Sequence, residues 1–449
     1  MKKILLCLTF LSCLATARIN AQQRLDNETQ AAKTARMQWW TDARFGMFIH
    51  WGLYSEPGRH EWVKNFERLD NDAYQKYFDN FDPDQFEPKK WAKEAKAAGM
   101  KYAVLTTKHH EGFCLFDSKY TDYKATNTKA GRDLVREFVD AFRSEGLKVG
   151  FYYSLIDWHH PDFTIDNRHP LRLDKADSVS YAALNKGKDF SKYRKYLFNQ
   201  VKELLTSYGK IDIMWLDFSY PGQFGKGHKD WHSKELLAMI RQLQPGIIVD
   251  NRLDLNDYED GYDFETPEQV KSEVLAKYRS KTWETCQTFS GSWGYFRDET
   301  SWKSNHVLLD LLISAVTNGG NLILNVGPTA RGSFDYRAVN HLDSIGYWMH
   351  ANSKAIYGCS YAPDSFKVPK GTKLSYNPKT KRLYVFLYDK PQNGLLKLPG
   401  YQGKLRYAQL LNDASEIQYT EDNNGQDIQL EMPKVWPPYD IPVIELMLN

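Results

Sequence analysis

Apolar runs alternate with helical patterns along about 330 residues of this chain, and this alternation constrains the fold more than any other feature. The runs are rich in β-branched and aromatic residues and cover Phe45–Trp51, Tyr102–Thr107, Lys148–Ser154, Ile211–Asp217, Ile247–Asn251, Thr282–Thr288 and Asn321–Val326. Helical patterns occupy Pro88–Ala98, Ala130–Glu145, Phe190–Tyr208, Ser233–Leu243, Ser304–Thr317 and Tyr336–Lys354. Near-continuous apolar strands predict a parallel sheet that is covered on both faces. Repeated βα units of this length favour an α/β fold of the (β/α)8-like TIM barrel type over an open doubly wound sheet.

From about Ala362 the helical patterns stop and only strand-like runs remain. These are Lys373–Tyr376, Arg382–Leu387, Leu395–Leu398, Leu405–Leu411, Ile428–Glu431 and Pro442–Leu448. Turn signals such as Asn-Gly and Pro-Lys separate them. We therefore expect a catalytic (β/α)8-like barrel over residues 22–357 and a small C-terminal antiparallel β-sandwich over residues 358–449.

The first 21 residues resemble a secretory signal peptide. Lys2 and Lys3 precede an apolar run, and small residues lead to a cleavage position after Ala21. The sequence therefore predicts a secreted or periplasmic protein. Cys13 faintly resembles a lipid-attachment signal, but Phe10 stands where such signals prefer Leu, so no lipid anchor is expected. No later apolar run is long enough for a membrane span.

The charge is nearly balanced, with 59 Lys and Arg against 56 Asp and Glu. Removal of the predicted signal peptide takes three basic residues and no acidic residue, so the remaining chain is formally neutral. This gives no general attraction to nucleic acid. The mature chain would keep Cys114, Cys286 and Cys359, with no C-x-x-C pair. Three free thiols is the simplest reading, and one disulfide between an unspecified pair stays open.

Polar and aromatic side chains end five of the predicted strands. They are His50 and Trp51, then His109 and His110, Tyr152 and Tyr153, Trp215 and Asp217, and Asn251 and Arg252. The C-terminal ends of barrel strands form one rim, where catalytic residues of this fold lie. A single His or Asp in such a place is more often structural or a helix cap. Five strands that end this way predict a site.

Asp217 is the strongest candidate for chemistry. Strand alternation places Trp215 and Asp217 on the same face, so the carboxylate would project into the barrel mouth beside an indole. Such a carboxylate suits attack on the anomeric carbon of a sugar, and a cation such as Arg252 would lower its pKa. A glycosidase also needs a protonated carboxyl group, for which Glu265, Glu268 and Glu284 are candidates. Spacing alone does not choose among these three.

Several motifs together resemble glycoside hydrolase family 29, the α-L-fucosidases. They are WTDARFGMFIHWG at 40–52, KHHEGF at 108–113, WLD at 215–217, SWGY at 292–295 and NGGNLILNVGP at 318–328. The matches keep their order from about residue 35 to residue 355. The resemblance implies a retaining exo-hydrolase that removes terminal α-L-fucose from glycans by double displacement, with fucosylated oligosaccharides or glycoconjugates as substrates and with no metal or other cofactor.

The resemblance also implies roles for residues at matching positions. Asp217 matches the nucleophile, and Glu268 resembles the acid/base of bacterial members, with Glu284 and then Glu265 as alternatives. Positions that match sugar contacts are His50, Glu61, Trp62, His109, His110, Tyr153, Trp215 and Arg252. The glycan linkage and the oligomeric state are not predicted.

Three other functions compete with this one. A metal-dependent hydrolase could use a set of possible ligands that comprises His109, His110, His159, His160 and Asp217. Adjacent His residues on a strand point to opposite faces, however, which suits chelation poorly. A catalytically silent sugar-binding protein on the same fold is a second alternative. A retaining hydrolase for a related sugar such as α-L-galactose is the third.

Overall fold

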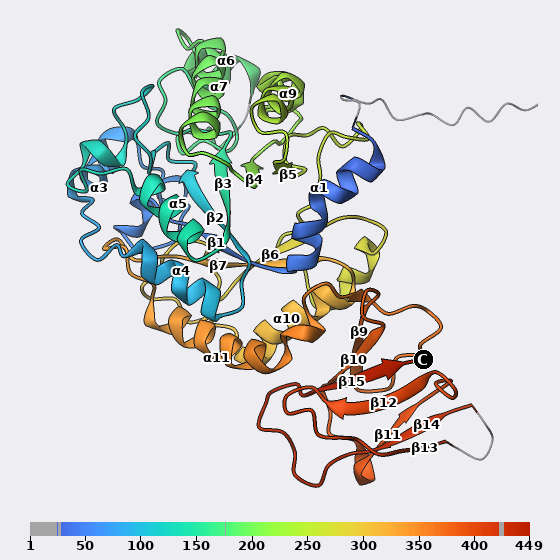
Figure 1. The fold of residues 1–449 in the computed structure, drawn as a ribbon. Helices are drawn as coiled ribbons and strands as arrows, with labels where there is room; N and C mark the ends of the chain where they lie inside the picture. The colour runs from blue at the N-terminus through green and yellow to red at the C-terminus, as the bar shows by residue number, and fades with distance from the viewer. Residues whose placement is uncertain (1–24, 26–27, 176, 422–425) are drawn as a thin grey trace, which may run out of the picture.

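The computed structural model describes residues 25, 28–175, 177–421 and 426–449. The predicted signal peptide lies outside these residues. Seven parallel strands form one sheet in the order β5-β4-β3-β2-β1-β7-β6 (Figure 1). They are β1 Phe45–Ile49, β2 Tyr102–Lys108, β3 Lys148–Ser154, β4 Ile213–Asp217, β5 Ile248–Val249, β6 Glu284–Thr288 and β7 Asn321–Val326. All seven predicted strands are present, with differences only at their ends.

An extended segment closes the space between the two edge strands of this sheet. Phe264 forms a parallel bridge with Asp250, immediately after β5. Glu265 forms one with Trp283, immediately before β6, and Glu268 forms one with Cys286 of β6. Residues 264–268 therefore occupy the place of an eighth strand. The predicted (β/α)8-like barrel is confirmed, with one position filled by irregular extended chain.

Helices cover the outside of the barrel. The six predicted helices are α4 Pro88–Ala97, α5 Leu134–Ser144, α7 Phe190–Ser207, α9 Ser233–Leu243, α10 Asn305–Thr317 and α11 Tyr336–Asn352. Asp133 caps α5 by accepting a hydrogen bond from the backbone N–H of Arg136 at 2.9 Å. The apolar face of α5 is buried, as its period of 3.6 residues predicts.

Other helices were not predicted from the sequence. These are α1 Gln30–Ala43, α2 Val63–Phe66, α3 Asn71–Asn80, α6 Ser178–Leu184 and α8 His228–Trp231. Short 3-10 helices occupy Leu53–Ser55, Ala125–Asn127, Ser272–Tyr278, Ser353–Ala355 and Gln392–Gly394. Among the helices formed by the described residues, none combines the length and apolar character that a membrane crossing needs.

The C-terminal region is antiparallel, as predicted. Five strands pair in the order β12-β15-β10-β9-β8 and three in the order β11-β14-β13. Their bounds are β8 Ser360–Tyr361, β9 Thr372–Asn377, β10 Arg382–Leu387, β11 Leu395–Leu398, β12 Leu405–Leu410, β13 Tyr419–Glu421, β14 Ile428–Glu431 and β15 Val443–Leu448. The two short strands β8 and β13 were not predicted. A separate apolar core fills the space between the two sheets.

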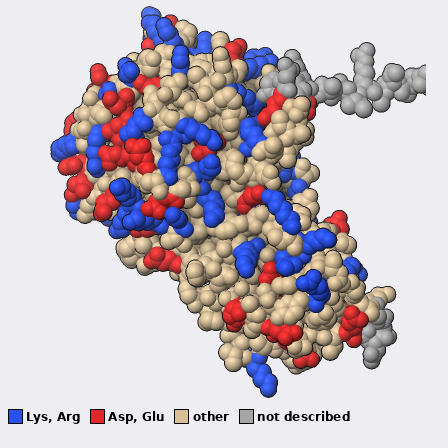
Figure 2. All heavy atoms as spheres, in the orientation of Figure 1, with Lys and Arg blue, Asp and Glu red and all other residues tan. Residues whose placement is uncertain are grey.

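Helix α10 of the barrel lies against β9 of this region (Figure 1), and polar side chains join the two. Asp310 of α10 accepts a hydrogen bond from the hydroxyl of Tyr388 at 2.5 Å and is paired with Lys373 of β9. On the face drawn in Figure 2, acidic and basic side chains are interspersed, and neither sign forms a continuous surface. The described Cys114, Cys286 and Cys359 are buried free thiols.

Candidate active site

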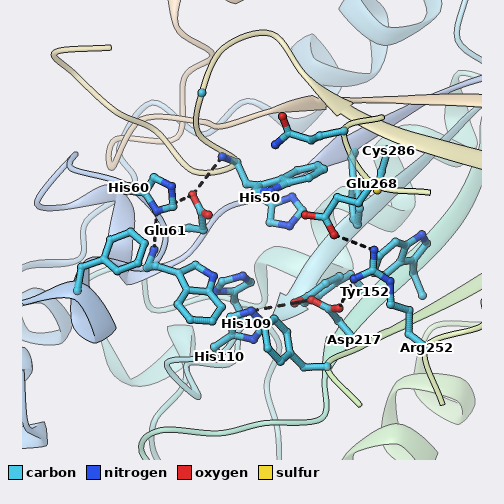
Figure 3. Close-up of a pocket in the computed structure, with 18 residues that line it drawn as sticks. His50, His60, Glu61, His109, His110, Tyr152, Asp217, Arg252, Glu268 and Cys286 are labelled. Carbon is cyan, nitrogen blue, oxygen red and sulfur yellow. Dashed lines mark hydrogen bonds and ion pairs between the residues drawn. The ribbon is translucent and has the colours of Figure 1, made fainter. Parts of the chain in front are cut away.

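A cavity of about 370 Å³ opens at the C-terminal ends of the barrel strands. Nine of the residues predicted for the site line it: His50, Glu61, Trp62, His109, His110, Trp215, Asp217, Arg252 and Glu268 (Figure 3). They come from segments that lie far apart in the sequence. The parallel barrel brings them together because every strand ends at the same rim.

Asp217 ends β4 and is almost fully buried in the cavity wall. Its Oδ2 accepts a hydrogen bond from the hydroxyl of Tyr152 at 2.8 Å, and its Oδ1 lies 3.0 Å from Nη1 of Arg252. Burial raises the pKa of Asp217 above its ordinary value, and the nearby Glu268 acts in the same direction. Arg252 and Tyr152 oppose this shift without cancelling it. The lowering effect expected of Arg252 is present, but burial outweighs it and the pKa of Asp217 is raised overall.

Arg252 connects the two carboxyl groups at the centre of the site. While Nη1 contacts Asp217, Nη2 lies 2.8 Å from Oε2 of Glu268 (Figure 3). The guanidinium carbon also lies 4.7 Å from the centre of the Trp215 ring. The two terminal nitrogens of one guanidinium thus contact both carboxyl groups and keep them close together.

The three glutamates considered for the second carboxyl group lie in different places. Glu268 is at the cavity, with 43% of its side chain exposed. Glu265 does not line the cavity, and its Oε1 pairs with Lys281 at 2.5 Å. Glu284 is fully buried at the opposite end of the barrel, because it begins β6 beside Asn321, which begins β7. Only Glu268 shares a partner with Asp217.

Tyr153, expected at the sugar, is placed elsewhere by the structure. Its hydroxyl donates to Oε1 of Gln200 on α7 at 2.8 Å, between the sheet and the helical layer. The adjacent Tyr152 lines the cavity instead. The reason is strand alternation together with register, since Tyr152 pairs with Trp215 and Ser154 pairs with Asp217. Alternation alone separates Tyr152 from Tyr153, and the register with β4 shows that the Tyr152 face meets the cavity.

Glu61 has a structural contact besides its position in the cavity. Its Oε2 accepts hydrogen bonds from the hydroxyl of Ser292 at 3.0 Å and from the backbone N–H groups of Trp293 and Gly294 at 3.1 and 3.0 Å. The carboxylate therefore holds the loop that follows β6. That loop places the Trp293 ring 5.0 Å from the ring of His50.

Three histidines form one wall of the cavity. The rings of His109 and His110 lie 3.9 Å apart, and His50 lies 5.6 Å from His109. Burial lowers the pKa of His50 and of His110, and for His110 the neighbouring histidines and the cations Lys108 and Arg252 add to this effect. The Nε2 atom of His110 lies 3.9 Å from Oδ2 of Asp217. With a lowered pKa His110 is neutral, so this distance does not describe an ion pair.

Aromatic side chains form much of the remaining wall, and several of them were not predicted to lie there. Among them are Phe48, Phe66 and Phe218. Phe218 follows Asp217 directly and has a φ of 81°, a strained value for a residue with a side chain. Its ring lies 5.4 Å from that of Trp62. No pattern in the sequence signals this backbone conformation.

The described residues contain no group of three or more His, Cys, Asp or Glu side chains arranged to hold a metal ion. His109 and His110 instead contact other side chains of the protein. His110 Nδ1 lies 2.8 Å from the hydroxyl of Ser154, and His109 Nδ1 lies 3.3 Å from Oε2 of Glu111.

Comparison with known proteins identifies many relatives with one activity in their names. A family model described as "Alpha-L-fucosidase" matches residues 12–354. The α-L-fucosidase of Dictyostelium discoideum is 28% identical over 89% of this chain and 90% of its own. The human tissue α-L-fucosidase is 29% identical over 80% of this chain and 77% of its own.

Solved structures agree with this. The α-L-fucosidase isoenzyme 1 of Paenibacillus thiaminolyticus has a TM-score of 0.84 and 43% identity, over 93% of this chain and 99% of its own. A Bacteroides thetaiotaomicron α-L-fucosidase of family GH29 has a TM-score of 0.81 and 31% identity, over 96% and 99%. That structure is described as a trapped covalent intermediate with 2-fluoro-fucosyl fluoride.

Proposed function

This chain belongs to the α-L-fucosidase family GH29 of glycoside hydrolases, and we propose that it removes terminal α-L-fucose from glycans with retention of anomeric configuration. The observation that carries the proposal is the pair of carboxyl groups joined by Arg252, with Asp217 buried and Glu268 half exposed. Retaining glycosidases place two carboxyl groups about 5 Å apart. A single guanidinium that contacts both supports such a short separation.

In the first step Asp217 acts as the nucleophile. Its carboxylate attacks the anomeric carbon on the face opposite the leaving oxygen, and an ester bond forms as the glycosidic bond breaks. Glu268 donates its proton to the leaving oxygen, which departs as a hydroxyl group of the remaining glycan. The partial exposure of Glu268 suits contact with a leaving group at the cavity mouth.

In the second step Glu268 acts as a base. Its carboxylate takes a proton from a water molecule whose oxygen attacks the anomeric carbon. The ester bond breaks, and Asp217 leaves as a carboxylate. Two inversions give fucose with the original anomeric configuration. Arg252 and the hydroxyl of Tyr152 stabilise the Asp217 carboxylate at both ends of this cycle.

Sugar recognition is assigned to the other cavity residues. We propose that His50, His109, His110 and Glu61 bind hydroxyl groups. The rings of Trp62, Trp215 and Trp293 would cover the apolar face and the methyl group of the sugar. Tyr153 has no part in this assignment, because it lies behind the strand.

The remaining sequence-based assignments stay proposals. We propose that residues 1–21 are a signal peptide that directs the protein to the periplasm or outside the cell, that residues 22–357 form the catalytic domain, and that residues 358–449 form the sandwich domain. The substrates would be fucosylated oligosaccharides or glycoconjugates. A panel of α-1,2, α-1,3, α-1,4 and α-1,6 fucosides beside nitrophenyl α-L-fucoside would define the linkage.

The test is substitution of the nucleophile. Asp217→Ala should lower kcat on nitrophenyl α-L-fucoside by on the order of 10⁴-fold. Azide should restore part of the rate and yield β-fucosyl azide, because it attacks from the side that the carboxylate vacates. Asp212→Asn changes a carboxylate that lies just before β4, where it accepts from the backbone N–H of Val149 at 3.1 Å, and should keep the wild-type kcat. Full activity of Asp217→Ala, or a first product of inverted configuration from the wild-type enzyme, would contradict the proposal.

A further inference from the structure

Two of the cavity histidines have hydrogen-bond partners that define which ring nitrogen carries the proton. For His50, Nδ1 lies 2.6 Å from Oδ1 of Asn325 on β7. The amide nitrogen of Asn325 donates to the backbone carbonyl of Trp293 at 2.6 Å. A carbonyl only accepts, so the amide nitrogen must face Trp293 and the amide oxygen must face His50. Nδ1 of His50 therefore donates.

The same reasoning applies to His110 through a different partner. Its Nδ1 lies 2.8 Å from the hydroxyl of Ser154, which ends β3. That hydroxyl donates its single proton to the backbone carbonyl of Ile156 at 2.7 Å. Because its proton is used in this way, the hydroxyl can only accept a hydrogen bond from His110, so Nδ1 of His110 is the donor.

We infer that Asn325 and Ser154 are positioning residues that hold His50 and His110 as neutral Nδ1–H tautomers, so that each presents a bare Nε2 atom to the cavity. A bare Nε2 accepts a hydrogen bond and cannot donate one. The two imidazoles therefore require hydroxyl groups that donate. This deepens the proposed function and rests on it for the identity of the ligand, which is L-fucose.

This inference predicts how the site discriminates among sugars. Two hydroxyl groups of the ligand must donate hydrogen bonds to the imidazoles. Their oxygens can then accept hydrogen bonds from other groups. A fluorine atom in place of such a hydroxyl keeps a weak acceptor and loses the donor. His109 differs, because its Nδ1 has no hydrogen-bond partner among the described residues, although Oε2 of Glu111 lies 3.3 Å away.

The first measurement is the tautomer itself. In protein with ¹⁵N-labelled histidine, NMR should show Nδ1 of His50 and His110 with a bound proton and Nε2 without one. Ser154→Ala should remove the preference at His110 and leave His50 unchanged. Thr107→Val is the matched control. It also removes a buried hydroxyl that donates to a strand carbonyl, here that of Tyr152 at 2.7 Å, but it contacts neither histidine. A proton on Nε2 of either histidine in the wild-type enzyme would overturn the inference.

The second measurement is binding of L-fucose and of its monodeoxy and monodeoxy-monofluoro analogues by calorimetry. At the two positions that face His50 and His110, both replacements should weaken binding to the same extent, by about tenfold each. If fluorine at these positions restored most of the affinity lost in the deoxy compound, the imidazoles would be donors and the inference would be wrong. Ser154→Thr should restore the wild-type pattern that Ser154→Ala loses.

The two proposals fail in distinguishable ways. An enzyme that neither binds L-fucose nor cleaves nitrophenyl α-L-fucoside would contradict the proposed function. The tautomers measured without ligand would still decide whether Asn325 and Ser154 position the histidines. Normal turnover with Nε2–H histidines would contradict only the inference.

Discussion

The rim and the floor of the barrel hold acidic side chains in opposite ways. At the rim, Asp217 and Glu268 share the Arg252 guanidinium, and Asp217 also accepts from Tyr152. At the floor, Glu284 is fully buried and accepts from the hydroxyl of Tyr102, while its Oε1 has no hydrogen-bond partner among the described residues. Burial raises the pKa of Glu284 to about 8.

This difference shows which surroundings allow a buried carboxyl group to take part in catalysis. A buried carboxylate without a cation is costly, so the group remains protonated near neutral pH. A carboxylate with a guanidinium and a phenol beside it can be charged in the resting enzyme. Glu284 and Glu268 are both associated with β6, but only the position at the rim allows catalysis. Substitutions at the two ends of the barrel test that distinction.

Among the substitutions that compare the rim with the floor, loss of the rim acid should have the largest effect. Glu268→Ala should lower kcat/KM on a fucosylated oligosaccharide by about 10³-fold, because the leaving oxygen loses its acid. On a dinitrophenyl fucoside, whose leaving group needs no proton, the first step should be far less affected. Steady-state kinetics on both substrates would measure this contrast.

Glu265→Gln and Glu284→Gln are the controls for that measurement. Glu265 pairs with Lys281 outside the cavity, and Glu284 lies at the floor. Neither should show a dependence on leaving group. If Glu284→Gln showed the dependence and Glu268→Ala did not, the assignment of the acid/base would be wrong.

Removal of the Arg252 guanidinium should have the next largest effect on activity. Arg252→Met is expected to lower kcat/KM by about 10²-fold and to raise the pKa of Asp217 further, because the guanidinium that lowers it is removed. Asp217 reacts as the carboxylate, so activity falls as pH falls through its pKa. The acid limb of the pH profile should therefore move to higher pH.

Arg337→Met is a matched control, because Arg337 also pairs with a carboxylate, Asp335, and lies over an indole, that of Trp302. It should leave the acid limb in place. An unchanged limb in Arg252→Met would contradict the electrostatic role of this arginine.

Substitution of Glu284 at the floor should change the stability of the protein and not its rate of catalysis. The folded protein keeps Glu284 protonated up to about pH 8, while the unfolded chain releases this proton near the ordinary glutamate pKa of 4.5. Between these values the folded state binds more protons, so the free energy of unfolding falls as pH rises, by about 1.4 kcal/mol per pH unit. Glu284→Gln should remove this contribution. Denaturant midpoints at pH 5 and pH 8 would measure it, and an unchanged pH dependence in the variant would argue against a neutral Glu284.

Much of this arrangement could be predicted from sequence because local patterns determine it. The period of two in Ile213–Asp217 correctly placed Trp215 and Asp217 on the cavity side. Each barrel strand was visible as an apolar run between polar breaks. The rim then followed from the parallel topology.

The features that could not be predicted depend on contacts between distant segments. The eighth position of the barrel is residues 264–268, which lack a strand-like apolar run, and their place depends on bridges to β5 and β6. Likewise, the role of Asn325 depends on a carbonyl at Trp293, and the pKa of Asp217 depends on burial by side chains from several strands. Alternation in β3 places Tyr152 and Tyr153 on opposite faces, but which face meets the cavity depends on the register with β4.

Tyr152 and Tyr153 give the test with the smallest expected effect. It compares the two faces of one strand and not the two ends of the barrel. Tyr152→Phe removes a hydrogen bond to a charged carboxylate, so kcat should fall by about tenfold and the acid limb should move to higher pH. Tyr153→Phe leaves Oε1 of the buried Gln200 without its donor, which should cost about 1–3 kcal/mol of stability and leave kcat unchanged. Kinetics and denaturant unfolding on both variants would separate the two roles. Because both substitutions delete one phenol oxygen from adjacent residues, a loss of kcat in both would mean that the strand transmits the disturbance. A loss in Tyr152→Phe alone would assign the effect to the face that meets the cavity.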